Sequence, residues 1–579
     1  MSAPTLDLEV LRHSTAHLMA AAVCELFPGA EYGIGPSIED GFYYDFLLPG
    51  GERFSDDDLP AIEARMGEIQ ARHSQYLRSE LSRGDALEEF RRRRQRFKVE
   101  LIERIAEGEV ISCYQTGDFF DLCRGPHVSE AGEIPAFKLL HTAGAYWHGD
   151  ETQPMLQRIY GTAWNSQAEL DLHLERLEMA RKRDHRRLGR ELDLFSMSDE
   201  LGGGLVLWHP NGATVRTVIE DYWRREHRRR GYQLVYTPHV AREHLWETSG
   251  HLGFFADEMY GPMEVEGERY RIKPMSCPFH ILIFSSRRRS YRELPMRLAE
   301  LASVYRFQRS GTLHGLLRVR GFTQDDAHIF CAPEQAEAEV AGVLDMVQGM
   351  RARFGFEQVE IDLSTKPSKA AGQDEMWELA EAALERAIRS RGLEFKLNPG
   401  EGAFYGPKVD VHIRDAMGRR WQCATVQFDF NQPERFGLEF IGADGLAHRP
   451  MMVHRTLLGS LERFFGVLLE HYGGALPVWL SPVQVQLITV SDDQLDYALG
   501  VAARLEQAGL RAEVPDRPGE RMQAKIRDGE LAKVPYLAVV GKREVEAGTV
   551  NLRSTRGGEQ MGLGIDDLIE RLRREAEQS

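Results

Sequence analysis

The chain has 579 residues and a mass of 65.8 kDa, which is too large for a single hydrophobic core, so we expect roughly three or four domains. With 42% hydrophobic and 28% charged residues and no low-complexity tract, it is typical of a soluble globular protein and unlike an extended disordered one. The formal net charge of -17 excludes indiscriminate nucleic-acid binding, which depends on Lys and Arg, and confines any RNA contact to local basic patches. Three Arg-rich runs fit such patches or, equally, solvated helix faces: residues 91–94 with Arg96, residues 228–230 and residues 287–289.

The N-terminal residues have neither a basic start followed by an apolar core nor an Arg- and Ser-rich leader, and the apolar stretch at residues 457–469 is interrupted by Ser, Glu and Arg. We therefore expect no membrane span and a cytoplasmic location. Scattered cysteines without framework spacing favour, in such a chain, free thiols, metal ligands or site residues over disulfides. The six are Cys24, Cys113, Cys123, Cys277, Cys331 and Cys423.

The chain divides into four segments in order. Residues 1–164 combine Gly/Pro turns, short β-like runs and one helical stretch from residue 55 to residue 96, which predicts an α+β unit. Residues 165–190 carry leucines at helical spacing and predict an amphipathic linker helix. Residues 191–476 mix strand-like runs with helices in an antiparallel-leaning α+β pattern. Residues 477–579 predict a small α/β domain ordered strand, helix, strand, helix, two strands and a closing helix.

Two pairs of metal-ligand-type residues lie in the first segment. His13 and His17 are four residues apart, so a helix would place both imidazoles on one face. Cys123 and His127 have the same spacing. Three imidazoles and a thiol make a tetrahedral zinc set, although each pair alone is also explained as a surface feature.

The pattern HxxxH followed by CxxxH, with GFYYD between them, resembles the editing domain shared by threonyl- and alanyl-tRNA synthetases. In the threonyl branch this resemblance implies a hydrolytic pocket that need not hold metal, and a structural zinc site remains the alternative. The residues that would bind the terminal adenosine and the seryl ester and position a water are His13, His17, Lys98, Asp121, Cys123 and His127.

Three further motifs resemble those of class II aminoacyl-tRNA synthetases. GYQLVYTPHV, which contains Pro238, resembles motif 1, the helix and strand that build the dimer interface, and so implies a homodimer. Residues 304–330 resemble motif 2 of the threonyl enzymes, a strand, a loop and a strand. Residues 454–466 resemble motif 3, in which a strand leads into a helix. The third segment should therefore be a class II catalytic domain built on an antiparallel sheet.

These motifs supply the cations that adenylate formation needs. A carboxylate attacks the α-phosphorus of ATP, bound with Mg²⁺, and fixed guanidinium groups suit the two anions that must approach. Arg306 and Arg463 are the expected catalytic cations, with Lys408 as a third. No Walker loop is present, since no GK[ST] follows the Gly-rich stretches. The family usually has Arg-x-Glu at the start of motif 2, where this chain has Gln308, so we expect weaker ATP binding than with Glu.

Cys277, His328 and His454 each stand where threonyl-tRNA synthetases place a zinc ligand. Three protein ligands leave one coordination position open, as in a working zinc site, and the resemblance implies one Zn²⁺ per subunit. An apolar pocket separates threonine from valine poorly, whereas a metal and Asp326 would be left unsatisfied by valine, which has no hydroxyl. Serine does have a hydroxyl, so a second, hydrolytic site is needed.

Other positions follow from the resemblance. Gln324 would bind the substrate carboxylate and Tyr405 its amino group, while Gln422 and Gln427 would form the pocket wall. His251 matches a histidine that helps deprotonate the accepting ribose hydroxyl, for which a near-neutral pKa is suitable. The fourth segment resembles an anticodon-binding domain, with Glu544 and Arg553 at base-reading positions, although each is also explained as an exposed charge.

The resemblance to threonyl-tRNA synthetases extends from about residue 11 onward, without the ubiquitin-like module that many members carry before the editing domain. It implies activation of L-threonine with ATP, transfer to tRNA(Thr) and hydrolysis of seryl-tRNA(Thr). Two other interpretations are a class II paralogue that binds tRNA or a partner without activating an amino acid, and a deacylase with a vestigial synthetase body. Threonine-dependent ATP–pyrophosphate exchange separates the three.

Overall fold

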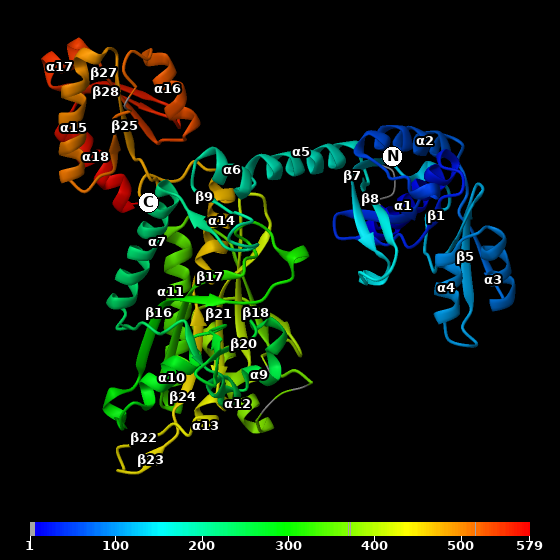
Figure 1. Ribbon diagram of the computed structural model, residues 1–579, viewed down its shortest axis with the longest axis horizontal. Helices are drawn as coiled ribbons and strands as arrows, with labels where there is room; N and C mark the ends of the chain where they lie inside the picture. Colours follow the sequence, from blue (N-terminus) through cyan, green and yellow to red (C-terminus); the bar gives the residue numbers. More distant parts are fainter. Residues whose placement is uncertain (1–5, 369, 371, 404, 516, 579) are drawn as a thin grey trace. The chain divides into compact units, whose positions relative to one another are not determined.

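The computed structural model describes residues 6–578 apart from 369, 371, 404 and 516 (Figure 1). The chain forms two compact units, Met1–Glu178 and Met179–Ser579. Within the described residues, no helix combines the length and the apolar character that crossing a membrane requires. The four domain ranges expected from the sequence stay a prediction.

The first unit contains two sheets on either side of helix α1, Leu8–Leu26. The larger sheet has the order β1-β3-β8-β7, with β2 paired to β3. Apart from β1 and β2, its strands are long, and α1 packs on β3 and β8 with a face of Leu, Met, Ala and Val, which forms the core of this unit. The strands are β1 (Glu31–Tyr32), β2 (Ser37–Ile38), β3 (Gly41–Leu47), β7 (Ala136–Tyr146) and β8 (Met155–Trp164).

The smaller sheet of this unit corrects the sequence interpretation. The expected single helical stretch from residue 55 to residue 96 is interrupted, because α2 ends near Ala71, His73 adopts a positive φ of 52°, and a strand follows. That strand, β4, pairs with β5, which pairs with β6, and α3 and α4 lie beside them. The bounds are α2 (Leu59–Ala71), β4 (Leu77–Leu81), α3 (Arg83–Arg92), α4 (Arg96–Arg104), β5 (Ile111–Thr116) and β6 (Phe119–Leu122).

The expected linker helix is two helices. Helix α5, Gln167–Arg183, ends before Asp184, and α6, His185–Glu191, begins there. The Asp184 carboxylate accepts from the backbone N–H of Arg186, which caps the second helix and explains the break. The division between the two compact units falls within α5.

The second unit is built on an eight-stranded sheet with the order β11-β16-β17-β24-β21-β20-β18-β19. All neighbours are antiparallel except β11 with β16 and β18 with β19. The antiparallel prediction for this segment is therefore confirmed. The strands are β11 (Gln233–Leu234), β16 (Met296–Tyr305), β17 (Gly321–Cys331), β18 (Val359–Ser364), β19 (Lys396–Asn398), β20 (Lys408–Arg414), β21 (Arg420–Asp429) and β24 (Met451–Thr456).

Helices α7, α11, α12 and α14 cover the sheet and share its largest apolar core. Helix α14 begins where the Ser460 hydroxyl accepts from the backbone N–H of Arg463, and it ends at Gly473, which takes a left-handed conformation. The bounds are α7 (Pro210–Arg229), α11 (Ala336–Arg353), α12 (Asp374–Ser390) and α14 (Leu461–Tyr472).

Smaller elements complete this part of the second unit. They are β9 (Phe195–Ser196), β10 (Leu207–Trp208), β12 (Val240–Arg242), α8 (Glu243–Ser249), α9 (His251–Phe254), β13 (Met263–Val265), β14 (Glu268–Ile272), α10 (Cys277–Ser285), β15 (Arg289–Ser290), α13 (Asn431–Arg435), β22 (Phe440–Ile441) and β23 (Ala447–His448). Helix α10 packs against β17, which brings its first residue to the central strands.

The last segment of the second unit forms a five-stranded sheet with the order β26-β25-β27-β28-β29. It contains one helix and one strand more than expected, α17 and β29. Helix α17 ends in a turn at Gly548, and a second turn at residues 554–558 separates β28 from β29. The bounds are β25 (Val485–Thr489), α15 (Leu495–Gln507), β26 (Ala512–Glu513), α16 (Met522–Leu531), β27 (Tyr536–Val540), α17 (Lys542–Ala547), β28 (Thr549–Ser554), β29 (Glu559–Gly564) and α18 (Ile565–Gln578).

Candidate active sites

The sheet register brings the three expected zinc ligands together. His328 on β17 is the direct cross-strand partner of His454 on β24, with ring centroids 4.6 Å apart. Cys277 is the first residue of α10, which packs on β17. One ligand atom from each of the three residues lies within 4.8 Å of the others, and all three side chains are buried. Residues far apart in the sequence thus form a compact thiol and imidazole set.

This donor set fits a zinc ion. Burial, with the neighbouring carboxylates of Asp326 and Asp429, raises the pKa of the Cys277 thiol well above its ordinary value. Burial and the nearby histidines lower the pKa of His328, which keeps its imidazole neutral and able to bind a metal. A cation bound between these groups would stabilise the Cys277 thiolate and would balance the negative charge of the Asp326 and Asp429 carboxylates.

A second layer of hydrogen bonds orients both histidines. His328 Nδ1 lies 2.8 Å from His280 Nδ1, and His280 Nε2 lies 3.4 Å from a Glu300 carboxylate oxygen. With His280 donating to Glu300, its Nδ1 accepts from His328, which leaves the Nε2 lone pair of His328 for a metal. His454 Nε2 lies 2.7 Å from the Asp429 carboxylate. This carboxylate–histidine arrangement is typical of metal sites.

A cavity of about 250 Å³ adjoins the ligand set. Gln324, Asp326 and His328 alternate along β17, so their side chains share one face of the sheet and line this cavity. The Gln324 side-chain carbonyl is buried and has no hydrogen-bond partner in the described part of the chain. The full lining is Met275, Cys277, Arg306, Gln324, Asp326, His328, Tyr405, Thr425, Gln427, His454, Arg455 and Thr456.

A second cavity, of about 340 Å³, shares four of these residues, Arg306, Gln324, Thr425 and Thr456. Its other lining residues are Glu258, Gln308, Leu317, Arg318, Val319, Phe322, Gln422, Cys423, Gly459, Ser460 and Arg463. It therefore contains three guanidinium groups and is suited to a polyanion. An acid placed in the first cavity would meet a phosphate placed in the second near the shared residues.

The turn between β24 and α14 is held by a residue that the sequence did not single out. Asp325 points away from the cavity and is fully buried. Its carboxylate accepts from the backbone N–H groups of Leu457, Leu458 and Gly459 at 2.9 to 3.1 Å. This fixes the start of the helix that carries Arg463. Asp325 directly precedes Asp326, so strand alternation alone could have marked it as a core residue.

Gln308 has an acidic neighbour in the second cavity. Its side-chain amide donates to the Glu258 carboxylate at 3.3 Å, and the backbone N–H of Phe307 donates to the Glu258 carbonyl. The cavity wall therefore contains a carboxylate although position 308 is not acidic. Glu258 was not expected from the sequence, because it lies in a short loop outside the recognised motifs.

Two expected catalytic residues lie outside the lining of both cavities. The Lys408 ammonium pairs with Asp410 at 2.8 Å, and Asp410 in turn accepts from Gln422. His251 is buried behind the ligand set, with Nε2 3.7 Å from Cys277 Sγ. Burial, then the charges of His454 and Arg306, lower the pKa of His251 to about 4, below the near-neutral value expected.

The remaining first-cavity residues face one another. The Tyr405 hydroxyl donates to the side-chain carbonyl of Gln427, and Gln427 is the cross-strand partner of His454. Gln422 lines the second cavity. The roles of all these residues toward a substrate stay predictions.

The first unit brings its own predicted set together. Helix α1 carries His13 and His17, and the segment after β6 carries Cys123 and His127. One ligand atom from each lies within 4.8 Å of the others. Cys123 Sγ lies 3.3 Å from His13 Nε2 and 3.2 Å from His127 Nε2. The expected helix at HSTAH and the expected proximity of the two pairs are both present in the structure.

A buried ion pair lies beside this set. Lys98 on α4 contacts the Asp121 carboxylate at 2.5 Å, and the other Asp121 oxygen lies 3.3 Å from His17 Nε2. The Tyr44 hydroxyl hydrogen-bonds both Lys98 and Asp121. Tyr44 belongs to the GFYYD sequence, but its role as the third member of this group was not expected. The cluster places a cation, an acid and imidazoles beside one another among buried side chains.

In the last domain, the two expected base-reading residues have internal partners. Glu544 accepts from the backbone N–H of Gly541, which begins α17, and from the side-chain amide of Asn551. Arg553 pairs with Glu530 at 2.8 Å and is partly exposed. In the basic run 287–289, Arg289 is buried and donates to backbone carbonyls, whereas Arg287 and Arg288 are exposed.

Three family models match the chain. Residues 262–472 match the class II core domain of tRNA synthetases for G, H, P, S and T. Residues 484–575 match an anticodon binding domain, and residues 111–160 match the second additional domain of threonyl and alanyl tRNA synthetases. Together with the antiparallel sheet and the two adjoining cavities, these matches define a class II aminoacyl-tRNA synthetase.

Individual relatives narrow this class. The threonine–tRNA ligase of Acidithiobacillus ferrooxidans is 54% identical over 559 residues, 96% of this chain and 86% of that protein. The chloroplastic/mitochondrial threonine–tRNA ligase 2 of Arabidopsis thaliana is 50% identical over 97% of this chain and 86% of its own length. The chain belongs to the threonyl-tRNA synthetase family.

Solved structures agree with this assignment. A crystal structure described as the RNA binding domain of the threonyl-tRNA synthetase of Cryptosporidium parvum is 40% identical, with a TM-score of 0.64, and covers 68% of this chain and 98% of that one. A threonyl-tRNA synthetase from Aeropyrum pernix is 31% identical, with a TM-score of 0.61, over 69% of this chain and 95% of its own.

Proposed function

We propose that this protein activates L-threonine with ATP, transfers the threonyl group to tRNA(Thr) and hydrolyses seryl-tRNA(Thr) at a separate site. The observation that carries the proposal is the convergence of Cys277, His328 and His454 on one wall of a cavity that continues into an arginine-lined one. The pair of cavities matches an amino acid and a nucleotide that react at their junction.

Cys277, His328 and His454 would hold a zinc ion, which when bound supplies a Lewis acid with an open position for the amino group and β-hydroxyl of threonine. Asp326 lies in the same wall and would accept a hydrogen bond from that hydroxyl. Valine offers no hydroxyl, so its binding would leave this buried carboxylate unpaired, at a cost of about 1–3 kcal/mol. Tyr405 and Gln427 would close the pocket around the amino group.

Arg306 and Arg463 would bind the phosphates of ATP, which enters with Mg²⁺. Their positive charge is fixed and sits in a partly dry cavity, where it stabilises the charge that develops on the phosphoryl oxygens. Gln324 lies where the two cavities meet, and its unused hydrogen-bonding capacity suits the carboxylate of the amino acid. Lys408 would act through Asp410 and Gln422, as a positioning residue.

In the first unit, the buried Lys98 and the histidines of α1 would orient a seryl ester and a water for hydrolysis. The buried Lys98 and Asp121 pair, joined by Tyr44, gives this pocket fixed charges without a metal. A zinc ion on the two His and Cys pairs is the alternative, and metal analysis distinguishes them. A homodimer built through motif 1, a cytoplasmic location and anticodon reading by Glu544 and Arg553 stay predictions from the family.

The test is threonine-dependent ATP–pyrophosphate exchange by the full chain, with valine and serine as competing substrates. We expect exchange with threonine, slower exchange with serine and very little with valine. Arg463→Ala should abolish exchange while leaving deacylation of seryl-tRNA(Thr) intact, and Lys98→Met should do the reverse. A wild-type chain that deacylates but supports no exchange would leave only the deacylase interpretation.

A further inference from the structure

A further cluster of ligand-type residues in the second unit lies outside the lining of both cavities. Asp184, His185 and Glu470 have metal-ligand proximity, but their atoms already have partners. Asp184 pairs with Arg186, while His185 Nδ1 lies 2.6 Å from a Glu470 oxygen and His185 Nε2 accepts from the backbone N–H of Leu316 at 3.0 Å. No lone pair of His185 is left for a metal, so the cluster has another purpose.

The hydrogen bonds fix the state of His185. Because Nε2 accepts from an amide, the ring proton of the neutral imidazole lies on Nδ1 and is donated to Glu470. The backbone N–H of His185 donates to the same Glu470 oxygen at 3.0 Å. His185 is fully buried and Glu470 is 3% exposed. The imidazole is therefore a rigid bridge between α14 and Leu316.

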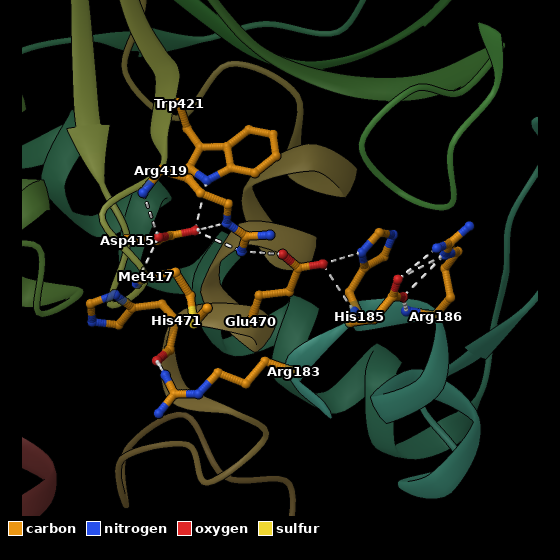
Figure 2. Close-up of polar contacts among 10 residues, drawn as sticks. Arg183, His185, Arg186, Asp415, Met417, Arg419, Trp421, Glu470 and His471 are labelled. Carbon is orange, nitrogen blue, oxygen red and sulfur yellow. Dashed lines mark hydrogen bonds and ion pairs between the residues drawn. The ribbon is translucent and has the colours of Figure 1, made fainter. Parts of the chain in front are cut away.

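Glu470 is itself held from the other side. Figure 2 shows its carboxylate between the His185 imidazole and the Arg419 guanidinium. Arg419 also donates to Asp415 at 2.7 Å, and Asp415 accepts from the Trp421 indole at 2.9 Å. Just before His185, Arg183 donates to the carbonyl of His471 at 2.9 Å. The end of α5 and the start of α6 are thus fastened to the last turn of α14.

Two glycines make room for this bridge. A Cβ atom at Gly315, whose φ is +46°, would lie 2.1 Å from His185 Nε2. A Cβ atom at Gly466 on α14 would lie 3.2 Å from the Leu317 side chain and 3.6 Å from the His185 ring. At Gly315 only glycine leaves room for the imidazole, whereas a side chain at Gly466 would require a small shift of Leu317 in the motif 2 loop, residues 306–320.

The bridge ends at the nucleotide cavity. Leu317, the residue after Leu316, presents its carbonyl to Arg463 Nε at 3.1 Å, and both residues line that cavity. Arg463 and Glu470 lie two turns apart on α14, so one rigid helix carries both ends of the path. Residues 316 and 317 are therefore hydrogen-bonded to His185 on one side and to Arg463 on the other.

We propose that His185 is a positioning residue for ATP: it fixes Leu316 and Leu317 of the motif 2 loop against α14, and so directs Arg463 into the nucleotide cavity. This rests on the proposed binding of ATP in that cavity. The connection also joins the start of α6, which follows the linker helix, to the phosphate-binding arginine. A displacement of the start of α6 would therefore change kcat/KM for ATP and leave the threonine KM unchanged.

The test compares His185→Asn with His185→Gln. The Asn amide takes the place of Nδ1 and keeps the bond to Glu470, but does not reach Leu316; the Gln carbonyl takes the place of Nε2 and keeps the Leu316 bond. In pyrophosphate exchange, normalised by active-site titration, His185→Asn should lower kcat/KM for ATP roughly ten- to a hundredfold with the threonine KM unchanged. His185→Gln should retain most of the wild-type value, because its carbonyl keeps the bond to Leu316 and its backbone N–H still donates to Glu470 on α14, although both variants lose thermal stability.

Equal kinetic losses in both variants, or an unchanged kcat/KM in His185→Asn, would overturn the proposal. If His185→Asn does not fold, Gly315→Ala is the second variant, since it crowds His185 Nε2 while leaving every bridge residue in place; it should produce the same ATP-specific loss, and normal ATP kinetics would count against the bridge. Arg463→Ala is the reference. If that variant keeps full exchange, the proposed role of the cavity fails; if it loses exchange while the bridge variants do not, only the role of His185 fails.

Discussion

At the scale of single residues, the proposed zinc ligands have hydrogen-bond partners that lie outside both cavities. His280 connects His328 to Glu300 and fixes which nitrogen of His328 is available to a metal. Loss of such a partner typically weakens metal binding by about 10- to 100-fold.

We therefore predict that His280→Phe, which keeps a ring in the same space, lowers zinc affinity by about 10- to 100-fold. Competition with a chromogenic chelator measures this directly in the full chain. His244→Phe is the matched control, because His244 is an exposed histidine on α8. Equal zinc retention by the two variants would show that His280 has no part in the site.

The pair Gln308 and Glu258 gives a second prediction. From the sequence alone, Gln308→Glu should improve ATP binding, because the family usually has an acid there. The structure places Glu258 at 3.3 Å from the Gln308 amide, so the new acid would face an existing one. Like charges at this distance repel, and the cost ranges from about 1 kcal/mol with the screening of bulk water to about 4 kcal/mol near a protein surface.

The expected result is a higher ATP KM for Gln308→Glu and a KM near wild type for the double variant Gln308→Glu/Glu258→Gln, which exchanges the two groups. Together with wild type and the single variant Glu258→Gln, these two variants form a double-mutant cycle. Strict additivity of the two single effects would contradict a direct interaction. An ATP KM unchanged in all of them would remove both residues from the nucleotide site.

The same residues show how far sequence reasoning reached. The identities of Cys277, His328 and His454 were predictable from motifs, but their proximity depends on the pairing of β17 with β24, which no local pattern encodes. Glu258 and Tyr44 were missed because their roles arise only from long-range contacts. The pKa of His251 was misjudged because burial, not residue type, sets it.

At the scale of elements, α7 contains a buried histidine that links folding to pH. His227 Nδ1 donates to the Trp223 carbonyl at 2.6 Å, and the two rings stack with centroids 3.7 Å apart. Burial, then the charge of Arg455, lowers the pKa of His227 to about 2. In the unfolded chain this group titrates near pH 6.5.

Between these two values the unfolded chain binds a proton that the folded chain does not, so stability falls as the pH drops through this window. His227→Phe keeps the stacking and removes the titration. Its loss of stability between pH 7 and pH 5 should be smaller than that of wild type by about 2 kcal/mol. Thermal unfolding at the two pH values measures this, and identical shifts in Tm would show that His227 is not the group responsible.

Elements were predicted well where a pattern was local and poorly where it was not. The four-residue spacing of His13 and His17 indicates the helix through HSTAH, and the resemblance to motif 2 implies its two strands; the structure contains all three elements. The short strand β4 was missed because it has little apolar alternation and lies between two helical runs. The linker was expected as one helix, since its leucine spacing does not reveal that Asp184 caps a second one.

At the scale of the whole molecule, two chemically different clusters serve one specificity problem. In the proposed function, the cavity beside Cys277, His328 and His454 would select a hydroxyl next to an amine, and the charged cluster of the first unit would remove serine. The α+β fold class and the class II core followed from the motifs, and family comparison confirms them. The sequence did not reveal that His185 and Glu470 join the linker to the nucleotide cavity, since neither belongs to a recognised ligand motif.

The most direct test of the account measures zinc content and threonine-dependent pyrophosphate exchange together, in wild type and Cys277→Ala. We expect one zinc per chain in wild type and none in Cys277→Ala. The exchange rate of Cys277→Ala should fall by more than the roughly 100-fold that loss of a hydrogen-bond partner of a ligand typically causes. A wild-type protein free of zinc that turns over fully, or a Cys277→Ala variant with undiminished exchange, would contradict it.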